Sequence, residues 1–226
     1  MGAHPRYTGQ HRHNASGDHR NWVDAKKKMV VAAERDEAAR KEWRDEISAI
    51  ESEKLVFVDE TGATIALTRR FARAPKGQRA HGSVPRNYGI STTLVGSLSL
   101  EGLGAVMTVE GAVDGLTFTE YVRQLLCPTL RPGQVVVVDN LSAHKADEAR
   151  LLIEAAGCNL LFLPAYSPDF SPIELTFSKI KEGLRARSAR TQEALDRAIA
   201  ETIDIVTDSD ARGWFIHCGY SPASSN

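Results

Sequence analysis

The chain has 226 residues, of which 42% are hydrophobic and 25% are charged, and its formal net charge is −1. This length is enough for one substantial α/β core or two small ones, and we expect one. No apolar run approaches the roughly 20 residues that cross a bilayer, and the N-terminal segment holds no apolar signal core, so we expect a soluble, cytoplasmic protein without a membrane partner. The three cysteines form no CxxC pair, which argues against a zinc knuckle or a disulfide framework.

The N-terminal part divides into a leader and a helix. Residues 1–24 are polar and show no hydrophobic periodicity, which predicts a disordered leader. From residue 25 to about residue 52 the residues favour helix, and Trp43, Ile47 and Ile50 recur at the spacing of one helical face. We therefore expect an amphipathic helix over about 25–52.

Short β-branched runs then alternate with turns and helices. We predict strands at 55–58, 64–67, 89–100, 135–138 and 159–164, with a turn at Gly62 between the first two. Helices are predicted at about 116–126, at 145–157, from Pro172 and from Thr191. The order β-β-β-α-β-α-β-α, flanked by N- and C-terminal helices, indicates an α/β fold with a mixed sheet and helices on both faces. The runs VVVV and LLFL, apolar throughout, predict central parallel strands.

Two of the predicted strands end in aspartate, Asp59 after LVFV and Asp139 after VVVV. Ligands of open α/β sheets bind at the carboxyl ends of strands, where side chains leave the core. A single strand-end aspartate can equally begin a turn or cap a helix. Neither strand needs a charge to end it, so the pair indicates that both carboxylates meet at one site.

Glu174 has two interpretations. In the segment FSPIEL, Ser171 suits the N-cap of a helix, Pro172 its first position and Glu174 its third, so a capping box would explain the glutamate completely. Together with the two aspartates, however, Glu174 would complete an all-oxygen site. Such ligands prefer Mg²⁺ or Mn²⁺ over zinc, and two such ions can support phosphoryl displacement.

The positive charge is concentrated in one band. No Asp or Glu occurs from Thr61 to Leu100, whereas six basic residues fall within that stretch. We predict that these residues, together with three on the helix that carries Glu174, neutralise DNA phosphates. The nine residues are Arg69, Arg70, Arg73, Lys76, Arg79, Arg86, Lys179, Lys181 and Arg185.

Three motifs together resemble a known family. They are VDETG (58–62), VVVVDNLSAHK (135–145) and LPAYSPDFSPIELTFSKIK (163–181), with 34 residues between Asp139 and Glu174. In these motifs and this spacing the chain resembles the DDE-type transposases of bacterial insertion sequences in the mariner-related superfamily. The resemblance covers roughly residues 26–220. It implies a ribonuclease H-like catalytic domain over 25–226 that cleaves and transfers DNA strands during transposition.

The same resemblance implies roles for particular residues. Asp59, Asp139 and Glu174 would be the catalytic triad that binds Mg²⁺ or Mn²⁺, with two ions expected, and Asn140 and His144 would orient substrate or ligands beside it. The implied partners are double-stranded DNA, at transposon ends and target, and a second copy in an active homodimer. Family members also carry helix-turn-helix domains, which the leader cannot form, so we expect an upstream reading frame to supply them or this copy to be truncated.

Other functions compete with this interpretation. A phosphotransferase could use Asp59 as a covalent nucleophile, although such enzymes commonly place a second acid where Thr61 stands. A truncated transposase could bind DNA or partner subunits without catalysis. A structure-specific nuclease of the same fold would share the chemistry and differ only in its substrate.

Overall fold

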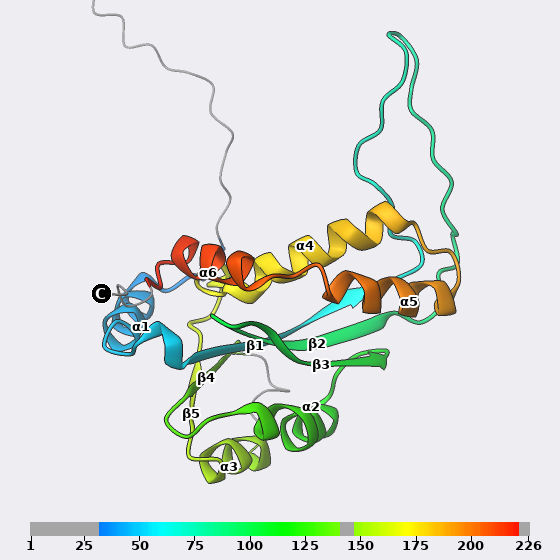
Figure 1. Ribbon diagram of the computed structural model, residues 1–226. Coiled ribbons are helices and arrows are strands. Elements are labelled where there is room, and N and C mark those ends of the chain that lie inside the picture. The colour runs from blue at the N-terminus through cyan, green and yellow to red at the C-terminus, as the bar shows by residue number, and fades with distance from the viewer. Residues whose placement is uncertain (1–31, 141–146, 222–226) are drawn as a thin grey trace, which may run out of the picture. The chain divides into compact units, whose positions relative to one another are not determined.

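The computed structural model describes residues 32–140 and 147–221, all within the unit Ala32–Asn226. One mixed sheet has the strand order β3-β2-β1-β4-β5 (Figure 1). Its strands are β1 (Leu55–Ala63), β2 (Thr92–Ser99), β3 (Gly102–Glu110), β4 (Val135–Val138) and β5 (Asn159–Phe162). β1 pairs with β4 and β4 with β5 in parallel, whereas β2 is antiparallel to both β1 and β3. The predicted mixed α/β sheet is therefore confirmed, and VVVV forms an internal parallel strand as predicted. The run LLFL, also predicted to be central, is parallel to β4 but lies at the edge of the sheet in β5.

Helices cover both faces of the sheet (Figure 1). One face packs against α1 (Glu37–Ile47), α4 (Pro172–Arg187), α5 (Gln192–Ile203) and α6 (Asp208–His217). The other packs against α2 (Gly115–Tyr121), which continues as a π-helical turn to Leu126, and against α3 (Asp147–Ala155). Alternation along β1 divides the two cores, since Leu55 and Phe57 belong to the first and Val56 and Val58 to the second.

The predicted order of elements is right, although one predicted strand is absent and one observed strand was not predicted. The strand predicted at 64–67 is a turn, closed by a 3.1 Å hydrogen bond from the Leu67 N–H to the Thr64 carbonyl. Gly62 does not turn the chain, because β1 continues through it to Ala63 while paired with β2. The strand predicted at 89–100 is present as β2, and the additional strand is β3, an edge strand that we did not predict from the sequence. Its mixed burial lacks the regular alternation on which a sequence-based prediction depends.

The N-terminal helix is shorter than predicted. Residues 1–31, which include the predicted leader, lie outside the described residues, and so do 145–146 at the start of the predicted 145–157 helix. α1 begins only after Asp36, whose carboxylate accepts hydrogen bonds from the backbone N–H groups of Ala38 and Ala39. This cap fixes the start of α1 at Glu37 rather than near residue 25. None of the described helices combines the length and apolar character needed to cross a bilayer.

Candidate active site

The pairing of β1 with β4 places two aspartates side by side. The parallel register joins Val58 to Val138, and Asp59 and Asp139 are the next residues along each strand. The chain after β4 leaves the sheet, whereas β1 continues beyond Asp59 as a strand paired with β2. Both carboxylates are partly buried and line one pocket. The two aspartates therefore lie at the same pocket, although Asp59 does not end its strand as the sequence suggested.

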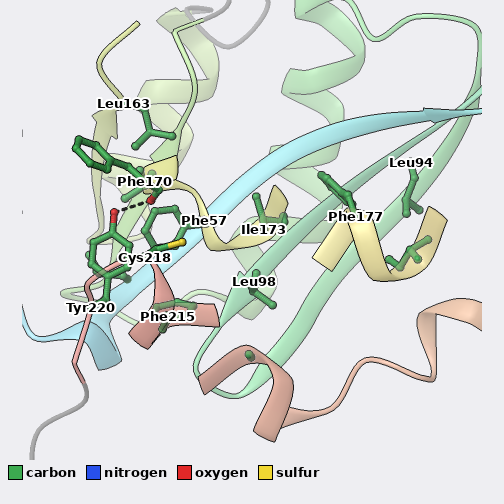
Figure 2. Packing of buried hydrophobic residues seen from close by; sticks show 14 of the residues in the cluster. Phe57, Leu94, Leu98, Leu163, Phe170, Ile173, Phe177, Phe215, Cys218 and Tyr220 are labelled. Atoms are coloured by element: carbon green, nitrogen blue, oxygen red, sulfur yellow. Dashed lines mark hydrogen bonds between the residues drawn. The ribbon is translucent and has the colours of Figure 1, made fainter. Parts of the chain in front are cut away.

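Glu174 reaches the same pocket from α4. Ile173 and Phe177 anchor the first turns of this helix against the sheet (Figure 2), while Glu174 between them is exposed. Ser171 is the N-cap residue, but its side chain makes no capping hydrogen bond. The capping box that could have explained Glu174 is therefore absent, and the glutamate faces the pocket.

The pocket has a volume of about 530 Å³. Besides the three acids, its walls include Glu60, Asn140 and the loop from Leu163 to Pro168. The backbone φ of Tyr166 in this loop is 56°, a conformation that L-residues seldom adopt and that tends to occur at functional sites. Glu60 and this strained backbone were not foreseen from the sequence. The position of Glu60 directly after Asp59 was the only signal for its presence.

Burial and mutual repulsion perturb the acids. Burial raises the pKa of Asp59 to about 7, against the opposing hydrogen bond that its carboxylate accepts from the Glu60 N–H at 2.8 Å. The negative charges of Glu174, Glu60 and Asp139 raise it further. Although the Glu174 side chain is exposed overall, partial desolvation of its carboxylate beside the pocket raises its pKa; the charge of Lys181 lowers this pKa and that of Asp139 raises it. The carboxylates therefore repel one another electrostatically, and a cation among them would relieve this repulsion.

The donor set fits hard divalent cations, since it consists of carboxylate oxygens in a polar pocket with no histidine or cysteine in its described lining. Within the described ranges, no three acidic, histidine or cysteine side chains are grouped tightly enough to hold one ion as they stand. Asp59, Asp139 and Glu174 would therefore have to draw closer around a metal.

The remaining predicted site residues are distributed unevenly. Asn140 lines the pocket, whereas His144 lies outside the described residues. Lys179 forms an ion pair with Asp210 at 2.5 Å, which holds the pKa of Asp210 down to about 2, so this lysine already has an anionic partner. Lys181 is near enough to Glu174 to affect its pKa. The six basic residues between β1 and β2 are all exposed: Arg69, Arg70, Arg73, Lys76, Arg79 and Arg86.

Comparisons with known proteins agree with this geometry. Residues 54–196 match the family model of the DDE superfamily endonucleases, and no curated protein sequence matches the chain. Among solved structures, a pre-cleavage Mos1 transpososome aligns with a TM-score of 0.70 and 17% identity over 88% of this chain and 65% of that one. A Mos1 mariner paired-end complex with Mn aligns with a TM-score of 0.66 and 16% identity over 87% of this chain and 64% of that one. The catalytic domain of Mos1 mariner transposase aligns with a TM-score of 0.60 and 16% identity over 81% of this chain and 86% of that one.

These likenesses show a shared fold, and this chain spans about two thirds of the length of the Mos1 chains in the larger complexes. The family match covers more than half of the chain and includes Asp59, Asp139 and Glu174. The chain belongs to the DDE superfamily endonucleases.

Proposed function

We propose that this chain is the catalytic domain of a DNA transposase, in which Asp59, Asp139 and Glu174 hold two divalent cations, Mg²⁺ or Mn²⁺. The observation that carries the proposal is the register of β1 and β4, which brings two carboxylates from distant parts of the sequence into one pocket with Glu174. Membership of an endonuclease family supplies the class of reaction. Similar Mos1 structures include paired-end complexes with Mn and with Mg, which supports the choice of cation.

When bound, two such ions would activate a water or a 3′-hydroxyl and stabilise the leaving oxygen in an in-line displacement. The residues around the pocket set the charge and the hydrogen-bonding groups that these ions would meet. Asp59 has a pKa of about 7 and must lose its proton to become a ligand, and the approach of positive charge favours that loss. Lys181 limits the negative charge at the Glu174 side. Asn140 lies on the pocket wall, where its amide can hydrogen-bond substrate or a ligand carboxylate.

We propose double-stranded DNA as the substrate and the basic residues between β1 and β2 as phosphate contacts. This segment projects beyond α4 and α5 (Figure 1), which makes its charges accessible to a long polyanion. Transposon ends fit this role, since two of the similar structures are a paired-end complex and a strand transfer complex of Mos1. The active homodimer and the helix-turn-helix partner stay predictions.

The test compares matched amide variants. The full chain is incubated with supercoiled plasmid and Mn²⁺, and separately with pre-cleaved duplexes that carry a free 3′-hydroxyl. We expect metal-dependent nicking and strand joining by the wild type, and loss of both in Glu174→Gln and Asp139→Asn. Glu154→Gln, which alters an exposed glutamate on α3, should behave as the wild type. Equal nicking by Glu174→Gln and the wild type would contradict the proposed site.

Two other outcomes would favour the competing functions. A folded protein that binds Mn²⁺ and DNA but neither nicks nor joins strands would support a regulatory DNA-binding role. A trapped phospho-aspartate at Asp59 would support a phosphotransferase. The structure offers no support for that enzyme class, because Asp59 lies within β1 and Thr61, two residues further on, is still paired with β2.

A further inference from the structure

The segment that leads into α4 is held by residues from both ends of the described chain. Asp169 and Phe170 belong to a 3₁₀ turn, Pro168–Phe170, directly before α4. Glu174 follows Phe170 by one helical turn, and Pro168 is part of the pocket wall. The conformation of this turn therefore bears on where Glu174 lies in the pocket.

The guanidinium group of Arg40 in α1 forms a bidentate hydrogen-bonded ion pair with Asp169 in this turn. Its Nη1 donates to Asp169 Oδ1 at 3.0 Å and its Nη2 to Oδ2 at 2.7 Å. Arg40 is only 5% exposed, and its guanidinium carbon lies 3.8 Å from the centroid of the Phe170 ring. A two-point hydrogen bond with a planar group fixes direction as well as distance. The hydrogen bonds and charge of Arg40 outweigh burial and hold the pKa of Asp169 below its usual range.

Phe170 is held on further sides. The Trp43 ring stacks on it with centroids 5.3 Å apart and an interplanar angle of 12°, and the Arg44 guanidinium lies 3.9 Å from its centroid. The Tyr220 hydroxyl donates a buried 2.6 Å hydrogen bond to the Phe170 carbonyl (Figure 2). We call these five residues, Arg40, Trp43, Arg44, Phe170 and Tyr220, together with Asp169, the Phe170 clamp.

A stabilising role alone would not require this arrangement. Burying a guanidinium is costly, and apolar residues of similar volume often stabilise a core equally well. A bidentate ion pair additionally fixes the distance and relative orientation of the two groups it joins. Glu174 needs such control, because it is exposed and no hydrogen bond to its carboxylate is found among the described residues.

We propose that the Phe170 clamp positions Glu174 for metal binding, with Arg40 and Asp169 as positioning residues; this inference rests on the proposed function. α1, which contributes nothing to the pocket wall, would thereby control a metal ligand on α4. The clamp would set how readily Glu174 closes on a cation together with Asp59 and Asp139. DNA binding would not depend on it.

The test uses the full chain in four variants. Arg40→Met removes the fork and charge, Arg40→Lys keeps the charge without the fork, and Asp169→Asn removes the anion from a side chain that is 51% exposed. Lys41→Met is the matched control, since Lys41 is the next residue on α1, is 79% exposed and pairs only with Asp45 among the described residues. The readouts are Mn²⁺ affinity by calorimetry, kcat and KM for DNA nicking, and amide hydrogen exchange of residues 171–176.

We expect Arg40→Met to weaken Mn²⁺ binding and lower kcat by about tenfold or more, as loss of groups that orient metal ligands typically does. Its KM for DNA should stay unchanged, and amide hydrogen exchange at residues 171–176 should be faster than in the wild type. Arg40→Lys should have Mn²⁺ affinity and kcat between those of Arg40→Met and the wild type. Asp169→Asn should reproduce the loss in milder form, and Lys41→Met should match the wild type. If Arg40→Met does not fold, Arg40→Lys and Asp169→Asn decide.

Folded variants that are less heat-stable but keep wild-type Mn²⁺ affinity and wild-type exchange at 171–176 would overturn the proposal. A wild type that binds Mn²⁺ without cutting DNA would instead contradict the proposed function. In that case Mn²⁺ affinity and hydrogen exchange would still decide the role of the clamp.

Discussion

Replacing Asp59 with asparagine should stabilise the metal-free protein at neutral pH. The pKa of Asp59 rises from 3.8 to about 7 on folding, chiefly through burial. This change in pKa corresponds to at most about 4 kcal/mol of stability, because Asp59 is only partly buried and retains some contact with water. Because the folded state binds the proton more tightly, this contribution to stability is full below pH 3.8 and is lost as the pH rises through about 7. Asparagine has no proton to lose and can still accept the hydrogen bond from the Glu60 N–H.

The assay is urea unfolding of both proteins in EDTA between pH 4 and pH 8, followed by tryptophan fluorescence. Other carboxylates titrate in both proteins, so the informative quantity is the difference in the free energy of unfolding between them. This difference should be small near pH 4 and should grow in favour of Asp59→Asn by up to about 4 kcal/mol near pH 8. Added Mn²⁺ should stabilise the wild type at pH 8 and have little effect on the variant.

A difference that stays constant from pH 4 to pH 8 would refute the reasoning, because Asp59 would then have an ordinary pKa in the folded protein. A reversed slope would mean that a nearby cation, rather than burial, dominates its environment. Glu154→Gln serves as the control, since this exposed acid should give a parallel curve.

Two further predictions concern DNA binding. Arg73→Ala with Lys76→Ala should weaken DNA affinity and reduce the slope of log K against log salt concentration by up to about 2, and an unchanged slope would remove both residues from the footprint. Lys179→Met should leave that slope unchanged, because Lys179 already pairs with Asp210, whereas Lys181→Met should reduce it. Filter binding or fluorescence anisotropy at several salt concentrations would measure both, and equal effects of the two lysine variants would show that the Asp210 pair opens on DNA.

The positions of the two aspartates were predictable because the apolar run before each one indicates a buried strand, and the structure contains that strand. Four apolar residues precede each one, and such runs form the central strands of a sheet covered on both faces. What could not be predicted is that β1 continues past Asp59. The residues Glu60 to Gly62 have weak strand preference, and only their pairing with β2 keeps them extended.

The false strand at 64–67 and the missed strand β3 have opposite causes. The run TIAL is apolar because Ile65 and Leu67 pack partly against the core, and not because it pairs with a strand. Its carbonyls are satisfied by Arg190, whose Nη1 donates to both Ile65 and Leu67 at 2.9 Å. β3 shows the converse, since the backbone pairs with β2 although its sequence is irregular. In both cases a distant partner decides the local structure.

The extent of the functional unit follows from the same kind of long-range contact. The family match begins at residue 54 and ends at residue 196, so it contains the three acids but neither α1 nor Tyr220. Yet Arg40 and Asp169 are 129 positions apart and meet directly, and Trp43, Phe215 and Tyr220 are buried in the core beneath the turn that carries Phe170. A fragment limited to 54–196 would expose these apolar contacts and release the turn before Glu174. Segments outside the family match would therefore hold in place one of the three carboxylates to which we assign the metal site.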